Sequence, residues 1–369
     1  MKKTLLTICL VWMCFSLSAQ KIIDLSGKWS FSIDRQDNGE KEKWFSHTLN
    51  DFINLPGSMP EKLKGDEVTA KTQWTGSLYD SSYYYNPYME KYRKEGNIKF
   101  PFFLTPDKHY VGAAWYQKEV NIPADWKGER ILLFLERPHI ETTVWVNGQK
   151  TGMQNSLCVP HQYDITRYVR PGKCTITIRV DNRIKEINVG PDSHSITDQT
   201  QGNWNGIVGR ICLQTTPKTY FDDIQIYPEP EQKLARVKVV IKGTGTAKVK
   251  LSAESFNTDK KHIVPAIQQE IKLNKGVTET EMVLPMGNDM LLWDEFHPAL
   301  YKLKAEVTNG KKTEIKEIQF GIRRFEIKGK WFYVNGRKTQ LRGTVENCDF
   351  PLTGYAPMDV ESWEREIGR

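Results

Sequence analysis

Alternation of apolar and polar side chains with a period of two runs through most of this chain and limits its fold more than any other feature. In the segment 173–182, KCTITIRVDN, Ile176 and Ile178 are separated by threonine and arginine. This pattern is typical of a strand with one face in a core and the other towards water. The dipeptide Asn147-Gly148 suits the positive φ angles of a type I′ hairpin turn. The chain is therefore predicted to be mainly β.

The strands expected in residues 20–218 indicate a β-sandwich of the jelly-roll type, because they follow one another at short intervals with turn signals between them. The long insertion 66–110 is crowded with aromatic residues. Loops of this length in a compact domain are usually functional or disordered, and the aromatic content argues against disorder. The expected strands lie at 22–34, 113–123, 129–137, 141–152, 173–182 and 210–214.

Two further regions are expected after the proline-containing segment 215–230, which has the composition of a boundary. Residues 219–322 carry six or seven short alternating strands and are predicted to form an immunoglobulin-like sandwich. Residues 323–369 are predicted to contain a hairpin, an apolar strand at 339–345 and a helix that begins after Asp359. They would form the first βα unit of a truncated (β/α)8 barrel, and one such unit cannot close a barrel.

The first 19 residues have the layout of a secretory signal peptide. Lys2 and Lys3 precede an apolar run, and Ser18-Ala19 supplies small residues before Gln20. The apolar run is too short to span a membrane. We therefore expect cleavage near Ala19 and an exported protein, periplasmic or extracellular, without a membrane span.

Composition excludes several other classes of function. The net charge is +7 for the whole sequence, and losing two signal-peptide lysines lowers it to +5. Basic residues are interspersed with acidic ones, so nucleic acid is not an expected partner. After cleavage four cysteines remain at irregular spacings, without a CxxC pair, so zinc or thioredoxin-type chemistry is not expected. We expect no cofactor or catalytic metal, and leave a structural divalent cation, disulfide formation and the oligomeric state open. The cysteines are Cys158, Cys174, Cys212 and Cys348.

Three passages together resemble glycoside hydrolase family 2, which includes β-galactosidases, β-glucuronidases and β-mannosidases. Residues 114–152 with 163–182 are similar to its amino-terminal sugar-binding jelly roll. Residues 293–307, WDEFHPALYKLKAEV, resemble the end of its immunoglobulin-like domain. Residues 320–357, with FYVNGRKTQLRGTV, are similar to the entry into its catalytic barrel. The order and spacing of the three passages make the resemblance specific.

The resemblance implies retaining O-glycosyl hydrolysis, with β-galactosidase-like activity as the leading expectation. This chemistry uses two carboxylates about 5 Å apart, one as acid/base and one as nucleophile. In the family both are glutamates on later barrel strands, which would fall beyond Arg369. No catalytic residue is therefore expected in this chain, and it is predicted to be inactive alone. Which sugar and linkage it takes stays open, because the selective residues would lie mostly on later barrel loops.

Two loops are candidates for contact with a sugar. The loop 198–205 offers hydrogen-bonding groups and one flat apolar ring, as a sugar site requires. The alternative is a turn-rich connection with its tryptophan packed as core. The second loop follows the predicted strand 339–345; there the family often has a histidine and this chain has none, and the alternative is a polar loop that caps a strand. The candidate residues are Asp198, Asn203, Trp204, Asn205, Glu346, Asn347 and Asp349.

Other features receive a weaker functional interpretation. The tyrosines between Tyr83 and Tyr88 could also contact sugar, whereas His139 and His161 are interpreted as structural. No GxSxG, HExxH, Walker or dinucleotide motif is present. The leading hypothesis is the amino-terminal part of a family 2 glycosidase acting on an oligosaccharide or polysaccharide. The alternative is a non-catalytic carbohydrate-binding protein of two β-sandwich domains.

Overall fold

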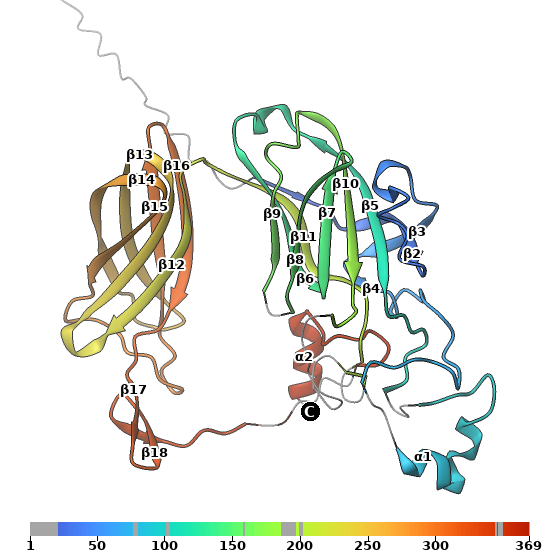
Figure 1. The fold of residues 1–369 in the computed structure, drawn as a ribbon. Helices are drawn as coiled ribbons and strands as arrows, with labels where there is room; N and C mark the ends of the chain where they lie inside the picture. Colours follow the sequence, from blue (N-terminus) through green and yellow to red (C-terminus); the bar gives the residue numbers. More distant parts are fainter. Residues whose placement is uncertain are drawn as a thin grey trace, which may run out of the picture. The chain divides into compact units, whose positions relative to one another are not determined.

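The structure is a computed structural model that divides into two compact units (Figure 1). The first unit comprises Lys21–Thr215 together with the segment from Gly343 onwards, and the second unit comprises Thr216–Arg342. The residues described are 21–76, 80–100, 104–157, 159–185, 197–198, 202–343, 345 and 350–368. Among them, no helix is long and apolar enough to cross a membrane.

The first unit consists of two antiparallel sheets, as the alternating sequence predicts. One sheet has the order β1-β11-β6-β9, with β4 also paired to β11, and the other has the order β3-β2-β5-β10-β7-β8. The strands are β1 Ile22–Asp24, β2 Gly27–Asp34, β3 Asp51–Leu55, β4 Gly57–Ser58, β5 Ala113–Ile122, β6 Arg130–His139, β7 Glu141–Val146, β8 Gln149–Asn155, β9 His161–Asp164, β10 Gly172–Asp181 and β11 Gly206–Thr216.

Inward-facing side chains of both sheets form one core in the first unit. Ile176 and Ile178 of β10 lie in it with Leu133 of β6, all fully buried. The opposite face of β10 is less exposed than simple alternation predicts, since Thr177 and Arg179 are also buried. The segment 35–50 covers this face and packs its aromatic rings on Trp115 and Trp145. The turn Asn147-Gly148 has positive φ at both residues, as predicted.

The region 219–322 contains five strands, which are fewer and longer than the six or seven that the sequence predicts. Its sheet has the order β12-β13-β15-β16, with β14 paired to β13. Each of the two longest strands fuses two predicted ones, because a bulge at Gly243 and Gly245 bends β13 without ending its pairing to β14. The strands are β12 Tyr220–Glu229, β13 Leu234–Phe256, β14 Ile263–Pro285, β15 Leu300–Asn309 and β16 Lys312–Phe320.

The predicted boundary segment is mostly strand. β11 continues to Thr216 and β12 begins at Tyr220, so only residues 217–219 separate them. Proline therefore marks the ends of β12 without breaking it. The remaining helices are short: η1 Trp44–Ser46, α1 Ser81–Tyr85, η2 Pro87–Tyr92, η4 Ala124–Trp126 and η5 Pro230–Gln232.

The carboxyl-terminal region contains the predicted hairpin and helix. β17 Phe325–Lys328, β18 Trp331–Val334 and β19 Arg337–Thr339 form a small sheet, and both turn residues of the β18–β19 hairpin have positive φ. The helix α2 Val360–Ile367 begins after Asp359, whose carboxylate accepts the Ser362 N–H. Residues 340–343 are irregular. An extended barrel strand needs hydrogen-bonded neighbours, and within the described residues β19 pairs only with β18.

Candidate functional site

The loop singled out around position 200 lies where β10 ends and β11 begins. Its four candidate residues, Asp198, Asn203, Trp204 and Asn205, are between 1 and 6% exposed. Buried polar side chains must find partners inside the protein, and those of Asp198, Asn203 and Asn205 do. The four residues therefore contact other parts of the protein itself.

Asp198 joins this loop to the base of the long insertion. Its carboxylate accepts the backbone N–H of Thr75 at 2.7 Å and that of Asn203. The same carboxylate lies 3.3 Å from Nε2 of His109, and the Asp198 N–H donates to the Thr75 carbonyl. The ring of Trp74 packs on His109, with centroids 4.5 Å apart. The beginning of the insertion, at Thr75, and its end, at His109, are thus both bonded to the Asp198 carboxylate.

The base of the insertion also closes on itself. Asp66 and His109 exchange both backbone hydrogen bonds, at 2.9 and 3.0 Å. A cavity of about 430 Å³ lies beside them and is bordered by Arg35, Thr72 and Tyr110 as well. The exposed Arg35 guanidinium forms an ion pair with Asp66 on its rim. His109 was not singled out from the sequence, because its partners are 43 and 89 residues away.

Asn182, Asn203 and Asn205 form a network of side-chain amides. Asn182 accepts the Gly112 N–H at 2.8 Å and donates to the Asn203 side chain at 3.1 Å. Asn203 donates to the Asn182 carbonyl at 2.9 Å. Asn205 donates to the carbonyl of Gly112 and accepts the Tyr116 hydroxyl at 2.7 Å. The network joins three loops, and Asn182 was missed although an amide directly after a strand was visible in the sequence.

Trp204 lies between two aromatic rings. The centroid of its ring is 4.6 Å from that of His139 and 5.5 Å from that of Tyr355. The imidazole of His139 donates from Nδ1 to the Trp204 carbonyl at 2.9 Å. Burial lowers the pKa of His139 to about 3, so this histidine is neutral near pH 7. A Cβ on Gly354, at φ +82°, would come within 2.7 Å of Trp204.

The segment 350–355 is fixed to the same surface by polar contacts. The Tyr355 hydroxyl donates to Glu61 at 2.8 Å, and the Ser58 hydroxyl donates to the carbonyl of Thr353. Burial and the Glu61 carboxylate raise the pKa of Tyr355. Although burial opposes it, hydrogen bonds from Lys62 and Tyr355 lower the pKa of Glu61. The residues after Phe350 thus pack on the loop end of the first unit.

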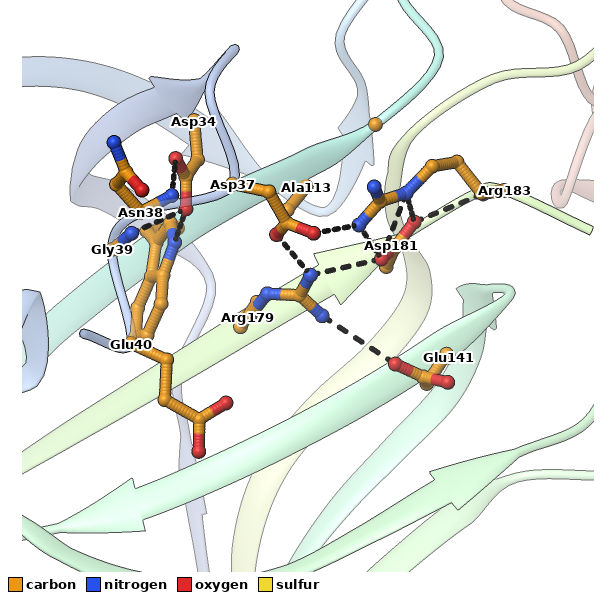
Figure 2. Close-up of polar contacts among 12 residues, drawn as sticks. Asp34, Asp37, Asn38, Gly39, Glu40, Ala113, Glu141, Arg179, Asp181 and Arg183 are labelled. Carbon is orange, nitrogen blue, oxygen red and sulfur yellow. Dashed lines mark hydrogen bonds and ion pairs between the residues drawn. The ribbon is translucent and has the colours of Figure 1, made fainter. Parts of the chain in front are cut away.

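Figure 2 shows a second polar cluster, on the opposite face of β10, which we call the ion cluster. Asp181 has a fully buried side chain and contacts Arg179 at 2.9 Å and Arg183 at 2.6 Å. Although burial opposes it, these cations and Lys185 lower the pKa of Asp181. The ion cluster ties the turn at residue 37 to the end of β10. Its members are Asp37, Glu141, Arg179, Asp181, Arg183 and Lys185.

The other predicted residues lie elsewhere. Glu346, Asn347 and Asp349 are outside the described residues, so their contacts with sugar stay a prediction. His161 is buried and bonds to Thr142 and to a backbone carbonyl. Cys174 and Cys212 are buried free thiols. Within the described ranges, no group of three or more His, Cys, Asp or Glu side chains is placed to hold a metal ion.

Two family descriptions match this chain in succession. Residues 22–217 match the family described as "Glycosyl hydrolases family 2, sugar binding domain", and residues 219–323 match "Glycosyl hydrolases family 2". The chain is 24% identical over 355 residues to a β-glucuronidase of Paenibacillus borealis, covering 91% of this chain and 51% of that protein. It is 25% identical over 281 residues to a β-galactosidase of Thermoanaerobacter pseudethanolicus, covering 71% of this chain and 35% of that protein.

The fold is also similar to solved structures. The apo structure of a β-glucuronidase from Ruminococcus gnavus superimposes with a TM-score of 0.61 at 19% identity, covering 88% of this chain and 49% of that one.

Human β-glucuronidase is 24% identical over 369 residues, 49% of its own length. This chain thus spans about half the length of these glucuronidases, or less of other relatives. Since the two matched families together cover most of its residues, the chain belongs to glycosyl hydrolases family 2.

Proposed function

We propose that this chain is the amino-terminal part of a retaining family 2 glycosidase. The observation that carries the proposal is the succession of the two family matches, 22–217 and then 219–323, in one chain. Relatives named as β-galactosidases and β-glucuronidases align with 71 to 91% of the chain. Residues 323–369 would then lead into a catalytic barrel.

Retaining hydrolysis proceeds through a covalent glycosyl-enzyme intermediate. One carboxylic acid protonates the leaving oxygen while a carboxylate about 5 Å away attacks the anomeric carbon. We propose that both groups are glutamates encoded after Arg369 in a longer protein. The residues of this chain would position the loops that surround such a site.

The buried loop residues have an indirect role in this proposal. Asp198 and Asn203 have their polar atoms bound to the chain itself, and Trp204 is covered by Tyr355 and Gly354. We infer that they fix the insertion and the segment 350–355, and that these segments carry the sugar-contacting groups. Glu346, Asn347 and Asp349, which precede the docked segment, are the candidates for direct contact.

For the substrate we propose a β-galactoside, with a β-glucuronide as the competing candidate because relatives of both names match. The test is hydrolysis of aryl β-galactosides and aryl β-glucuronides. Residues 20–369 alone are expected to give no turnover, whereas a longer product carrying a downstream Asn-Glu pair is expected to hydrolyse one of the two. Turnover by residues 20–369 would contradict the assignment of the catalytic carboxylates.

The competing function is a carbohydrate-binding protein without catalysis. The observation that favours it is the match of residues 22–217 to a family described as a sugar binding domain. Sequencing the DNA after codon 369 separates the two functions. A continuation that encodes barrel strands with two glutamates supports the glycosidase, and an immediate stop without a downstream frame supports the binding protein.

We also propose that the protein is exported. The proposal rests on the charged, apolar and small-residue order of Met1–Ala19. Amino-terminal sequencing of the protein from a periplasmic or culture-medium fraction should begin near Gln20. Recovery only from the cytoplasm with Met1 intact would contradict export.

A further inference from the structure

The small sheet of β17, β18 and β19 in the second unit (Figure 1) has one apolar face. Phe325 is opposite Val334 in the ladder and Ile327 is opposite Phe332, so all four side chains lie on the same side of the sheet. The ring centroids of Phe325 and Phe332 are 5.5 Å apart, which agrees with this placement. Val334 is buried, whereas Phe325, Ile327 and Phe332 are 49, 68 and 36% exposed. Most of this apolar face is therefore uncovered within the described chain.

A groove of about 920 Å³ continues the apolar face towards the loop before β15. The Asn335 side chain donates to the Trp293 carbonyl at 3.0 Å, and the Arg337 guanidinium forms an ion pair with Glu295 at 2.6 Å. These contacts fix the hairpin to the loop, so the groove has two defined walls. The apolar side chains that line it are Trp293, Phe296, Phe325, Val334 and Leu341.

The groove also carries an excess of positive charge. Besides the paired Arg337, three more cations line it, namely Arg323, Lys338 and Arg342, and within the described ranges none of the three forms an ion pair. The Arg323 guanidinium lies 5.0 Å from the ring centroid of Trp293. Because arginine binds carboxylates through paired, charge-assisted hydrogen bonds, a partner that carries carboxylates complements this groove.

The carboxyl-terminal region has no apolar core of its own. Among the described residues after 322, Val334 is the one apolar side chain that is buried. In the helix α2, Val360 and Ile367 lie on one face, two turns apart, and are 73 and 80% exposed. A sheet or helix with an apolar face is stabilised by packing that face on another element. These elements therefore need a further body of protein to pack against.

We propose that the face of β17–β19 and its groove dock the part of the longer protein that follows residue 369, through a contact segment that carries apolar side chains and carboxylates. This inference rests on the proposed function, because it requires a continuation into a catalytic barrel. The relatives have room for such a partner, since this chain covers 51% of the Paenibacillus borealis protein and 49% of the human one. Residues 323–342, in the region that leads towards the barrel, supply most of the groove, so groove and partner are joined covalently.

The composition of the surface favours this partner over a sugar or a second copy. Protein interfaces are enriched in aromatic residues and arginine relative to the rest of the surface, and the groove combines both. A sugar in the groove leaves Ile327 and Phe332 uncovered, because they lie outside it. Two copies that meet through the groove bring unpaired cations together, which is unfavourable.

The test is hydroxyl-radical footprinting of residues 20–369 and of the longer product, read at single side chains by mass spectrometry. In residues 20–369, Phe325 and Ile327 are expected to react freely. In the longer product they are expected to react about fivefold more slowly, because side chains at the centre of an interface are fully buried. The matched control is Val277 of β14, which is 48% exposed and is expected to react equally in both.

A pair of charge variants of the longer product tests the groove itself. Arg323→Gln/Arg342→Gln is expected to raise the rate of Phe325 about twofold, because a carboxylate of the partner then lies buried without its cation. The control, Lys248→Gln/Lys272→Gln, removes two exposed cations outside the groove and is expected to leave that rate unchanged. Equal rates in the two variants would overturn the assignment of carboxylates to the partner.

The remaining outcomes separate this proposal from the proposed function. Equal rates for Phe325 and Ile327 in both products would overturn the docking surface, even where the longer product hydrolyses an aryl glycoside and the proposed function stands. Protection without hydrolysis would support the docking surface and contradict the glycosidase. Protection in residues 20–369 alone that grows with protein concentration would identify a second copy as the occupant and overturn the proposal.

Discussion

The two units bury different kinds of side chain. In the described part of the second unit, the buried polar residues are Thr216, Thr219, Thr278 and Glu314, around a core of valine, leucine and isoleucine. The first unit buries ionisable groups and amides as well as a similar apolar core. The buried ionisable and amide side chains of the first unit include His109, His139, His161, Arg179, Asp181, Asn182, Asp198, Asn203 and Asn205.

This difference shows where the molecule fixes its loops. Burial of apolar side chains stabilises a fold but is not directional, so it does not select particular contacts. A buried polar group, by contrast, is destabilising unless specific partners form hydrogen bonds with it. In the first unit the partners belong to loops far apart in sequence, such as Thr75 and Asp198. Loop positions are therefore specified there by individual polar contacts, whereas the second unit is held mainly by apolar packing.

A substitution in the ion cluster is expected to lower the free energy of unfolding more than any other change considered below. Asp181→Ala removes a fully buried carboxylate, so that the cations Arg179, Arg183 and Lys185 of the ion cluster are left with only Asp37 and Glu141 as partners. Breaking a buried ion pair on one side destabilises by about 3–5 kcal/mol. Urea unfolding followed by the fluorescence of core tryptophans such as Trp115 should show a loss of this size.

The control for the ion cluster lies in the second unit. Glu279 and Lys238 form an exposed pair at 2.9 Å, and Glu279→Ala is expected to change stability much less than Asp181→Ala does, because water screens an exposed ion pair. Equal losses for Asp181→Ala and Glu279→Ala would remove the contrast between the units. A loss in Asp181→Ala confined to the first unit, seen by hydrogen exchange, would sharpen it.

The buried histidines are expected to have an intermediate effect on stability, and this effect depends on pH. His139 has a folded-state pKa of about 3 against an ordinary value of 6.5 because it is buried, and burial lowers the pKa of His161 as well. The unfolded state thus binds more protons below pH 6.5, and stability falls as pH decreases. For His139 alone the loss between pH 6.5 and 5 is about 2 kcal/mol.

The variant His139→Asn isolates this contribution. An asparagine amide can replace the Nδ1–H donor to the Trp204 carbonyl and does not titrate. Its stability is expected to change less between pH 6.5 and 5 than that of the wild type, while the residual slope reports His161. Urea midpoints at several pH values measure this. An unchanged slope would show that His139 does not titrate on unfolding.

The sequence was sufficient to predict most of the strands. The alternation at Ile176 and Ile178 and the turn at Asn147-Gly148 are local signals, and both appear in the structure as expected. The fused strands of the second unit were not predictable, since Gly243 and Gly245 read as turns although they form a bulge within a continuing ladder. Whether a glycine ends a strand or bends it depends on the strand opposite.

The polar network of the candidate site was only partly visible in the sequence. The loop with Asp198 and Trp204 was singled out for its hydrogen-bonding groups and flat ring, and the structure shows that these groups face other parts of the chain. Their partners, such as His109 and Tyr355, lie 89 and 151 residues away. A single sequence contains no signal for contacts of that range.

The smallest expected effect concerns the segment that docks on Trp204. Tyr355→Phe keeps the ring beside Trp204 and removes only the hydroxyl that bonds to Glu61. A hydrogen bond to a charged group contributes about 1.5–3 kcal/mol, and Glu61 keeps its Lys62 partner, so a loss near 1 kcal/mol is expected. Hydrogen exchange should become faster in residues 350–368 while β10 is unchanged. Tyr333→Phe, in the hairpin of the second unit, is the matched control. If exchange in residues 350–368 is the same in both variants, the Glu61 contact does not hold this segment, and ring packing on Trp204 is sufficient.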